Sequence, residues 1–303
     1  MNRIAVYALG GHALESTSSS DRTESALVMA KVVSDIIDLL ENNWRVVITH
    51  GNGPQVGRLL SMDEHEHHSM DEWVAATQGM IGHTLSLHLN SIFRQRERAE
   101  HCVALLTHVM VKRDDHGFEF PTKPVGKILT SSEVMSKDWD IAQTVNGPRR
   151  VVASPSPGAI IELEAIRQLL HLGVVVIAGG GGGIPIVDDG EDWYGVPAVI
   201  DKDLLSAEIA NQIDASALFI TTDVEAIYTQ YGTSQAKAHR IITTKQLEQF
   251  QENGEFPTGS MLPKTRALQA FVHQHENRTS ILCQPGEVLA ALRGQAGTTV
   301  VNT

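Results

Sequence analysis

The sequence is poor in cysteine and in basic residues, and it has no long hydrophobic run. Its two cysteines, in 303 residues, form no disulfide framework and lack the spacing of metal ligands. The apolar run at residues 4–9 is too short for a signal peptide or a membrane span, so we expect a cytoplasmic protein without membrane partners. The 24 Lys and Arg against 36 Asp and Glu give a formal net charge of −12, which repels nucleic acid.

Several catalytic motifs are also absent. There is no G-x-x-x-x-G-K-[ST], which excludes a P-loop enzyme, and no H-R-D or D-F-G set of a protein kinase. The acidic and histidine-rich stretch 63–68 lacks the H-E-x-x-H spacing that places two histidines on one helix face. We therefore interpret it as solvated surface and expect no metal site in the protein.

Short β-branched runs alternate with longer segments of helical period. The predicted strands are 4–9, 45–50, 102–111, 174–178, 217–222, 279–283 and 298–301. The predicted helices are 24–42, 72–96, 159–172, 203–212 and 261–274. Strands that are apolar throughout and separated by helices indicate an α/β protein with a mainly parallel sheet covered on both sides. Ligands bind such sheets beyond the carboxyl ends of the strands.

One stretch interrupts this alternation. Residues 112–150 are polar, rich in Pro and Gly, and without apolar periodicity. A structureless loop of that length is uncommon inside a compact domain. We therefore expect a small projecting subdomain, or lid.

Three glycine-rich turns follow predicted strands. They are Gly10-Gly11-His12, then Gly51-Asn52-Gly53, and then the run 179–183, which contains Gly181 and Gly182. Glycine lets backbone N–H groups approach an anion closely, and a following helix N-terminus adds a favourable dipole. Because three such turns fall at the same edge of one sheet, we predict that they surround a phosphoryl group.

Phosphoryl transfer also needs cations that offset the developing charge. Lys202 lies between two aspartates just before a helix, Lys264 enters another helix, and Lys123 lies between Thr122 and Pro124 in the expected lid. A lysine is usually a solvated surface charge. Because Lys202 and Lys264 lie at helix starts and Lys123 is next to a proline, we predict a role in catalysis for these three lysines instead.

With these residues in place, the chain resembles the carbamate kinases of the amino-acid-kinase superfamily over essentially its whole length. The segments that carry the resemblance are YALGGHAL, ITHGNGPQVG, VAATQGMIGHTLSLHLN, PTKPVG, RRVVASPSP, GGGGIPIV, AVIDKDLLSAEIA, ITTDVEAIY, PTGSMLPKTRAL and GTTVV. The resemblance implies a three-layer α/β/α sandwich, a homodimer, and reversible phosphoryl transfer between ATP and carbamate. It further implies an acceptor-binding lobe at 1–185, which includes the lid, and a nucleotide-binding lobe at 186–303.

The resemblance also implies roles for single residues. It assigns Gly10, Gly11, Gly51, Asn52 and Gly53 to the acceptor and the phosphoryl group in transfer. The catalytic group that it implies is Lys123, Lys202, Asp203 and Lys264, in which Asp203 orients the lysines. The implied border of the nucleotide, bound as ATP or ADP with Mg²⁺, is Asp223, Val224, Tyr228, Gly259, Ser260 and Met261.

The chain departs from the family pattern at two places. His12 stands where the family usually has asparagine; it can still donate a hydrogen bond, in a pH-dependent manner. After the lid a usual arginine is missing, and Ala153 and Ser156 replace proline and lysine. Two alternatives therefore stay open: a kinase with another small carboxylate acceptor, and a non-catalytic ligand sensor.

Overall fold

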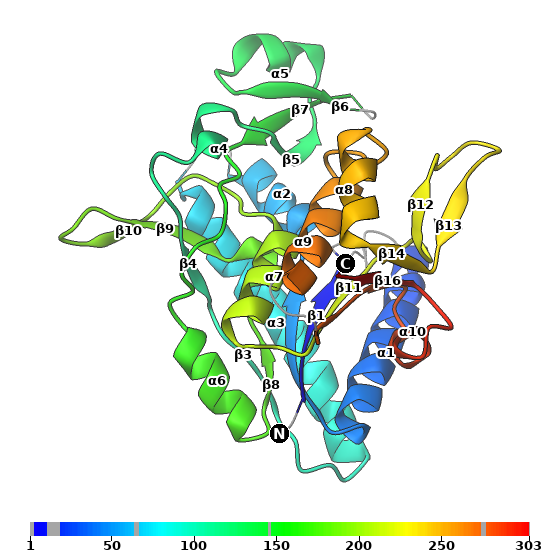
Figure 1. The fold of residues 1–303 in the computed structure, drawn as a ribbon. Helices are drawn as coiled ribbons and strands as arrows, with labels where there is room; N and C mark the ends of the chain where they lie inside the picture. Colours follow the sequence, from blue (N-terminus) through cyan, green and yellow to red (C-terminus); the bar gives the residue numbers. More distant parts are fainter. Residues whose placement is uncertain (1–2, 11–18, 64–66, 145–146, 274–276, 303) are drawn as a thin grey trace.

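An eight-stranded sheet forms the centre of the molecule in the computed structural model, which describes residues 3–10, 19–63, 67–144, 147–273 and 277–302 (Figure 1). Every neighbouring pair of its strands is parallel except β15 and β16. In spatial order the strands are β14 (Ile241–Thr243), β16 (Thr298–Val301), β15 (Thr279–Cys283), β11 (Ala217–Thr221), β1 (Arg3–Leu9), β2 (Trp44–His50), β8 (Val175–Ile177) and β3 (Cys102–Ala104).

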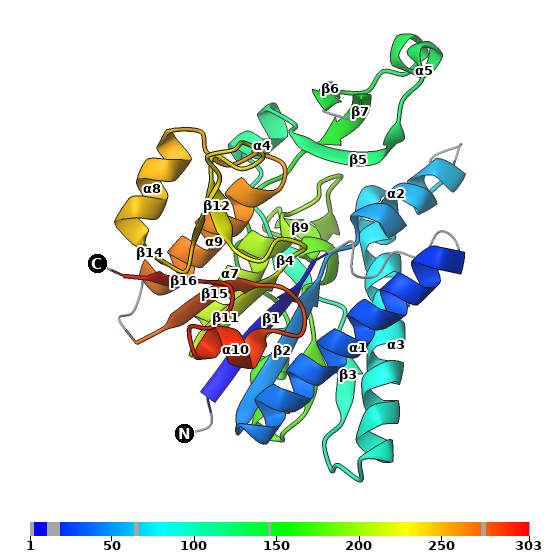
Figure 2. The same ribbon diagram turned by 90° about the vertical axis from the view of Figure 1, so that its right-hand side faces the viewer.

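Both faces of this sheet are covered by helices, as Figures 1 and 2 show. Along β1, Val6 and Ala8 join the core on one face, while Ala5, Tyr7 and Leu9 join the core on the other. The Val6 face packs against α6 (Leu163–His171), α7 (Lys202–Gln212), α8 (Thr244–Glu252) and α9 (Met261–His273). The Tyr7 face packs against α1 (Ser19–Glu41), α3 (Met70–Gln95) and α10 (Val288–Leu292). The predicted three-layer sandwich is confirmed.

The lid projects beyond the end of the main sheet (Figure 1). It contains an antiparallel sheet in the order β5 (Lys123–Ile128), β7 (Gly147–Val152), β6 (Ile141–Thr144), with the short helices α4 (His116–Glu119) and α5 (Ser131–Ser136). Helix α2 (Gly53–Met62) lies beneath it. A Cβ on Gly57 would lie 3.0 Å from the Cα of Gly126, so α2 and β5 touch backbone to backbone.

Two smaller sheets flank the sandwich. One has the order β10 (Trp193–Gly195), β9 (Ile184–Asp188), β4 (His108–Met110), and the other pairs β12 (Ile227–Thr229) with β13 (Lys237–His239). The 3₁₀ turn η2 (Gly180–Gly182) joins β8 to β9.

Two predicted elements are wrong in extent. The run 102–111 is not one strand, because β3 and β4 belong to different sheets. Between them the buried backbone N–H of Thr107 donates to the Gln78 side chain at 2.9 Å instead of to a neighbouring strand. The predicted helix 159–172 begins only at Leu163, because Ile160 and Ile161 pair with β4.

Candidate active site

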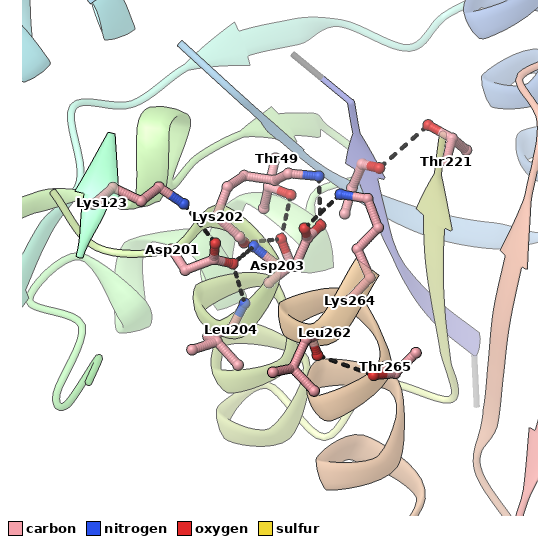
Figure 3. A network of polar contacts seen from close by, with 12 residues as sticks. Thr49, Lys123, Asp201, Lys202, Asp203, Leu204, Thr221, Leu262, Lys264 and Thr265 are labelled. Carbon is pink, nitrogen blue, oxygen red and sulfur yellow. Dashed lines mark hydrogen bonds and ion pairs between the residues drawn. The ribbon is translucent and has the colours of Figure 1, made fainter. Parts of the chain in front are cut away.

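Three lysines from three separate elements meet two carboxylates at the start of α7 (Figure 3). Lys123 comes from β5 of the lid, Lys202 is the first residue of α7, and Lys264 lies in the first turn of α9. The Nζ of Lys202 is 2.6 Å from Asp203 Oδ1, and the Nζ of Lys264 is 2.8 Å from Asp203 Oδ2. The Nζ of Lys123 is 2.6 Å from Asp201 Oδ2. The structure thus brings together all four residues expected in the catalytic group.

The local sequence explains why α7 begins where it does. Asp201 has extended backbone angles and caps the helix: its Oδ1 accepts hydrogen bonds from the backbone N–H groups of Asp203 at 2.8 Å and Leu204 at 3.3 Å. An aspartate in this position satisfies N–H groups that have no partner inside the helix. The cap therefore fixes Lys202 and Asp203 in the first turn, at the carboxyl end of the main sheet.

The buried charges shift one another's ionisation. Burial alone would raise the pKa of Asp203, but the ammonium groups of Lys202 and Lys264 outweigh it and hold that pKa below its usual range. Burial lowers the pKa of Lys202, opposed by Asp203. Burial would also lower the pKa of Lys264, but Asp203 raises it above its usual value. Asp203 is therefore ionised throughout the neutral range and holds two cations side by side.

The Lys202 ammonium retains donor capacity. Its contact with Asp203 is close, yet it lacks hydrogen-bond geometry, and no other hydrogen-bond partner occurs for it in the described part of the chain. A buried ammonium group carries three N–H donors, and leaving them unmatched costs free energy. Phosphate oxygens would match them.

A cavity of about 960 Å³ opens between the lid, α2 and the start of α9, and both Lys123 and Lys264 line it. All six residues expected at the nucleotide line the same cavity: Asp223, Val224, Tyr228, Gly259, Ser260 and Met261. Tyr231 and Phe256 add apolar surface beside them, and the rings of Tyr228 and Tyr231 meet edge to face at 5.5 Å. This end of the cavity can receive a flat apolar group.

The glycine turns divide into two groups. Gly10 and Gly53 line the cavity, and Gly10 approaches β11 so closely that a Cβ would lie 3.0 Å from the carbonyl oxygen of Thr221. Gly51 is not part of the lining; it is half-buried, and its N–H donates to the carbonyl oxygen of Leu9 at 3.2 Å. Gly11 and His12 lie outside the described residues.

The second group is buried and does not reach the cavity. It consists of Asn52, Gly181 and Gly182. The Asn52 amide donates to Thr77 Oγ1 at 2.9 Å and contacts Gly181, while Gly182 lies against the backbone of Ile200. Both glycines have positive φ angles and no room for a Cβ, so glycine is required there for packing. None of the three is part of the cavity lining as described, so their phosphoryl-binding role stays a prediction.

The chain matches the amino acid kinase family over residues 3–283. The chain belongs to this family. It is 37% identical over 310 residues to the carbamate kinase of Clostridium perfringens, covering 98% of this chain and 99% of that protein. It is also 37% identical over 318 residues to the carbamate kinase-like protein YahI of Escherichia coli, covering both chains completely. The structure of Giardia lamblia carbamate kinase bound to AMP-PNP superposes with a TM-score of 0.88 at 29% identity, covering 100% of this chain and 99% of that one.

In this amino acid kinase, the structure places at the site several residues that are not among the predicted site residues. One is Asp201: an aspartate directly before a helix is a recognisable N-cap signal. Arg58 and Arg149 line the same cavity as Lys123. Arg58 follows Gly53 of the second glycine turn by five residues, which places it in the second turn of α2. This spacing is the feature of the sequence that could have identified Arg58 as a site residue.

Proposed function

We propose that this chain is a carbamate kinase, which transfers a phosphoryl group reversibly between ATP and carbamate to give ADP and carbamoyl phosphate. The observation that carries the proposal is that Lys123 and Lys264 line one cavity, while Lys202, which is not itself part of the lining, shares Asp203 with Lys264. Full-length identity of 37% to the Clostridium carbamate kinase supports the choice of acceptor.

The arrangement suits an in-line transfer. A carbamate oxygen attacks the γ-phosphorus and the bond to the ADP oxygen breaks; because the carbamate is already an anion, no general base is required. Catalysis then consists of positioning and of offsetting charge on the phosphoryl oxygens. Lys202 and Lys264 supply that positive charge from the body of the protein, and Lys123 supplies it from the lid. The reverse reaction makes ATP by the same contacts.

ATP or ADP is the nucleotide that this proposal requires, with its base and ribose toward Tyr228 and Met261. Mg²⁺ usually keeps several waters and binds substrate phosphates with one or two carboxylates. The carboxylates of Asp201 and Asp203 already hold ammonium groups, and no cluster of three metal-ligating side chains occurs among the described residues. The site therefore fits a Mg²⁺ ion that is held mainly by the phosphates of the nucleotide and arrives with it. There the ion would neutralise phosphate charge.

The same placement suggests which part of the chain binds the acceptor and which binds the nucleotide. Residues 1–185 would hold the acceptor, with the lid at 112–150 above it, and residues 186–303 would hold the nucleotide. Supporting this, α2 and β5 line one end of the cavity and residues 222–231 and 255–261 line the other. In the described residues no helix combines the length and apolar character needed to cross a bilayer. We propose that the enzyme works in the cytoplasm on small molecules.

The protein would act as a homodimer. Strand β3 is an edge of the main sheet, and α3 packs beside it. Met80 and Leu87 of α3 are 54% and 58% exposed, and Leu106, two residues after β3, is 50% exposed. Large exposed apolar side chains gathered near a sheet edge are typical of an interface. A second copy of this chain is the occupant we propose.

The test is ATP formation from ADP and carbamoyl phosphate. Turnover with carbamoyl phosphate is the expected result. Activity with acetyl phosphate alone would instead support a kinase for another carboxylate acceptor, as the family departures at Ala153 and Ser156 allow. Binding of ATP without any turnover would support a ligand sensor, and either outcome would overturn the proposal.

A further inference from the structure

Asp201 connects the lid to the body of the enzyme through its two carboxylate oxygens. Oδ1 caps α7 by accepting from Asp203 and Leu204, and Oδ2 accepts from the Lys123 ammonium at 2.6 Å. Only 8% of Asp201 is exposed, so the contact is largely removed from water. Figure 3 shows Lys123 reaching from the lid toward this carboxylate while Lys264 reaches Asp203 from the other side.

The balance of charge makes this contact important. Three ammonium groups and two carboxylates meet here, and Asp203 is shared by Lys202 and Lys264. Asp201 is the sole ion-pair partner of Lys123 among the described residues. Without it, the Lys123 ammonium would have no carboxylate partner among the described residues, and a partly buried charge without a partner costs free energy.

Among the described residues, the other attachments of the lid at this point carry no charge. Lys123 pairs with Val152 in the lid sheet, and the next residue, Ala153, accepts a backbone hydrogen bond from Val199 of the body at 2.9 Å. Lys123 is the first residue of β5, and β5 touches α2 through the close backbone contact of Gly57 with Gly126. That contact sets a separation but supplies no charge or hydrogen bond of its own. The Lys123–Asp201 pair is directional, and its distance falls in the range of a charge-assisted hydrogen bond.

We propose that Asp201 is a positioning residue for phosphoryl transfer: it holds Lys123 of the lid over the cavity and fixes that lysine relative to the helix turn that carries Lys202 and Asp203. This inference rests on the proposed function. Because a displacement of about 1 Å can cost on the order of 10²-fold in rate, a group that fixes Lys123 affects turnover without touching the substrate.

Two substitutions separate this role from helix capping. Asp201→Asn keeps an oxygen that can cap α7 but removes the charge that holds Lys123. We expect kcat to fall about 10- to 100-fold, with KM for ADP changed by less than about twofold. Asp201→Glu keeps the charge but moves it away from the cap. Compared with Asp201→Asn, it should therefore retain a higher kcat and have a lower free energy of unfolding in urea. The opposite ranking of the two variants would overturn the proposal.

A double-mutant cycle tests the coupling to Lys123. If Asp201 acts through Lys123, the double variant Lys123→Ala/Asp201→Asn should have the same kcat as Lys123→Ala alone. Multiplicative losses, or wild-type kcat in Asp201→Asn, would contradict the inference.

A measurement that needs no turnover keeps the inference distinct from the proposed function. In Asp201→Asn, hydrogen exchange of β5 amides should become faster than in the wild type, while α9 stays unchanged. The control is Asp214→Asn, which removes an ion pair with Arg278 at 2.9 Å far from the lid and should leave β5 exchange unaltered. Unchanged β5 exchange in Asp201→Asn would overturn the inference, whereas an inactive wild-type protein with faster β5 exchange in the variant would overturn only the proposed function.

Discussion

At the scale of single residues, the site depends on cations whose positions are fixed by carboxylates. Lys264 illustrates this: it lines the cavity, and its ammonium is held 2.8 Å from Asp203. Removing it leaves Asp203 still paired with Lys202, so the fold should persist.

We expect Lys264→Ala to lower kcat for ATP formation by on the order of 10²- to 10³-fold, by analogy with the loss of one donor to a transition-state anion. Steady-state kinetics with carbamoyl phosphate and ADP would measure this, and circular dichroism would check the fold. Lys245→Ala on α8 is the matched control, because that side chain is exposed and away from the cavity. A Lys264→Ala enzyme with wild-type rates would show that the phosphate site lies elsewhere.

His50, at the end of β2, predicts a pH dependence of stability. It is fully enclosed, and burial lowers its pKa to about 4, with Nδ1–H donating to the carbonyl oxygen of Gly51 at 3.0 Å. Since the unfolded chain binds this proton more tightly, the stabilisation is complete above pH 6.5 and is lost as the pH falls toward 4. This difference in pKa between the unfolded and the folded chain corresponds to about 3 kcal/mol in the free energy of unfolding.

The measurement is the free energy of unfolding in urea at several pH values between 7 and 4, for the wild type and for His50→Gln. The loss on acidification should be smaller in the variant. Burial raises the pKa of Asp35 to about 6, which opposes the His50 effect in the same range, but this contribution cancels in the difference between the two proteins. His88→Gln, an exposed control, should follow the wild-type curve. Parallel curves for the wild type and His50→Gln would refute the prediction.

At the scale of elements, the lid depends on how closely α2 approaches β5. A side chain at Gly57 would collide with the backbone of Gly126, three residues after Lys123. Gly57→Val should therefore displace β5 and lower kcat by about 10-fold or more, because Lys123 moves with the strand. Kinetics together with hydrogen exchange of β5 would measure the effect.

The control for this prediction is Gly79→Ala in α3, where an added Cβ meets nothing within 4 Å. It should leave kcat unchanged and raise the free energy of unfolding by up to about 1 kcal/mol, since alanine favours a helix over glycine. Wild-type kcat in Gly57→Val would mean that the lid position is not set by this contact.

The elements themselves were predictable to different degrees. The helical segments that became α1, α3, α7 and α9 were predicted to within about five residues at each end. In α1, α3 and α9 one apolar face recurs at helical spacing, which is a local property of the chain. The division of 102–111 into β3 and β4 was not, since it depends on the Gln78 side chain reaching Thr107 from another element. The sheet inside the lid was also missed, because its strands carry polar residues and prolines that obscure alternation.

At the scale of the whole molecule, the exposed apolar surface of α3 predicts self-association. Leu87→Lys should shift the protein from dimer to monomer, because a charge would be buried without a partner at the interface. Sedimentation velocity at micromolar concentration would measure the shift. Leu172→Lys is the control: Leu172 is 78% exposed at the end of α6, on the opposite side of the sheet. A monomeric wild type, or an unaffected dimer in Leu87→Lys, would contradict the prediction.

Local patterns in the chain were enough to predict the sandwich architecture and the residue types of the site, because strand and helix periodicity and glycine turns do not depend on distant neighbours. Tertiary structure decided which charges meet. Lys123 and Asp201 are 78 positions apart, and Lys264 and Asp203 are 61 apart, so only the fold of β5, α7 and α9 around one cavity could pair them. The tertiary structure also placed Gly10 and Gly53 at the cavity and enclosed Gly181 and Gly182 among closely packed atoms. Burial depends on residues that are distant in the sequence, so the local sequence cannot predict it.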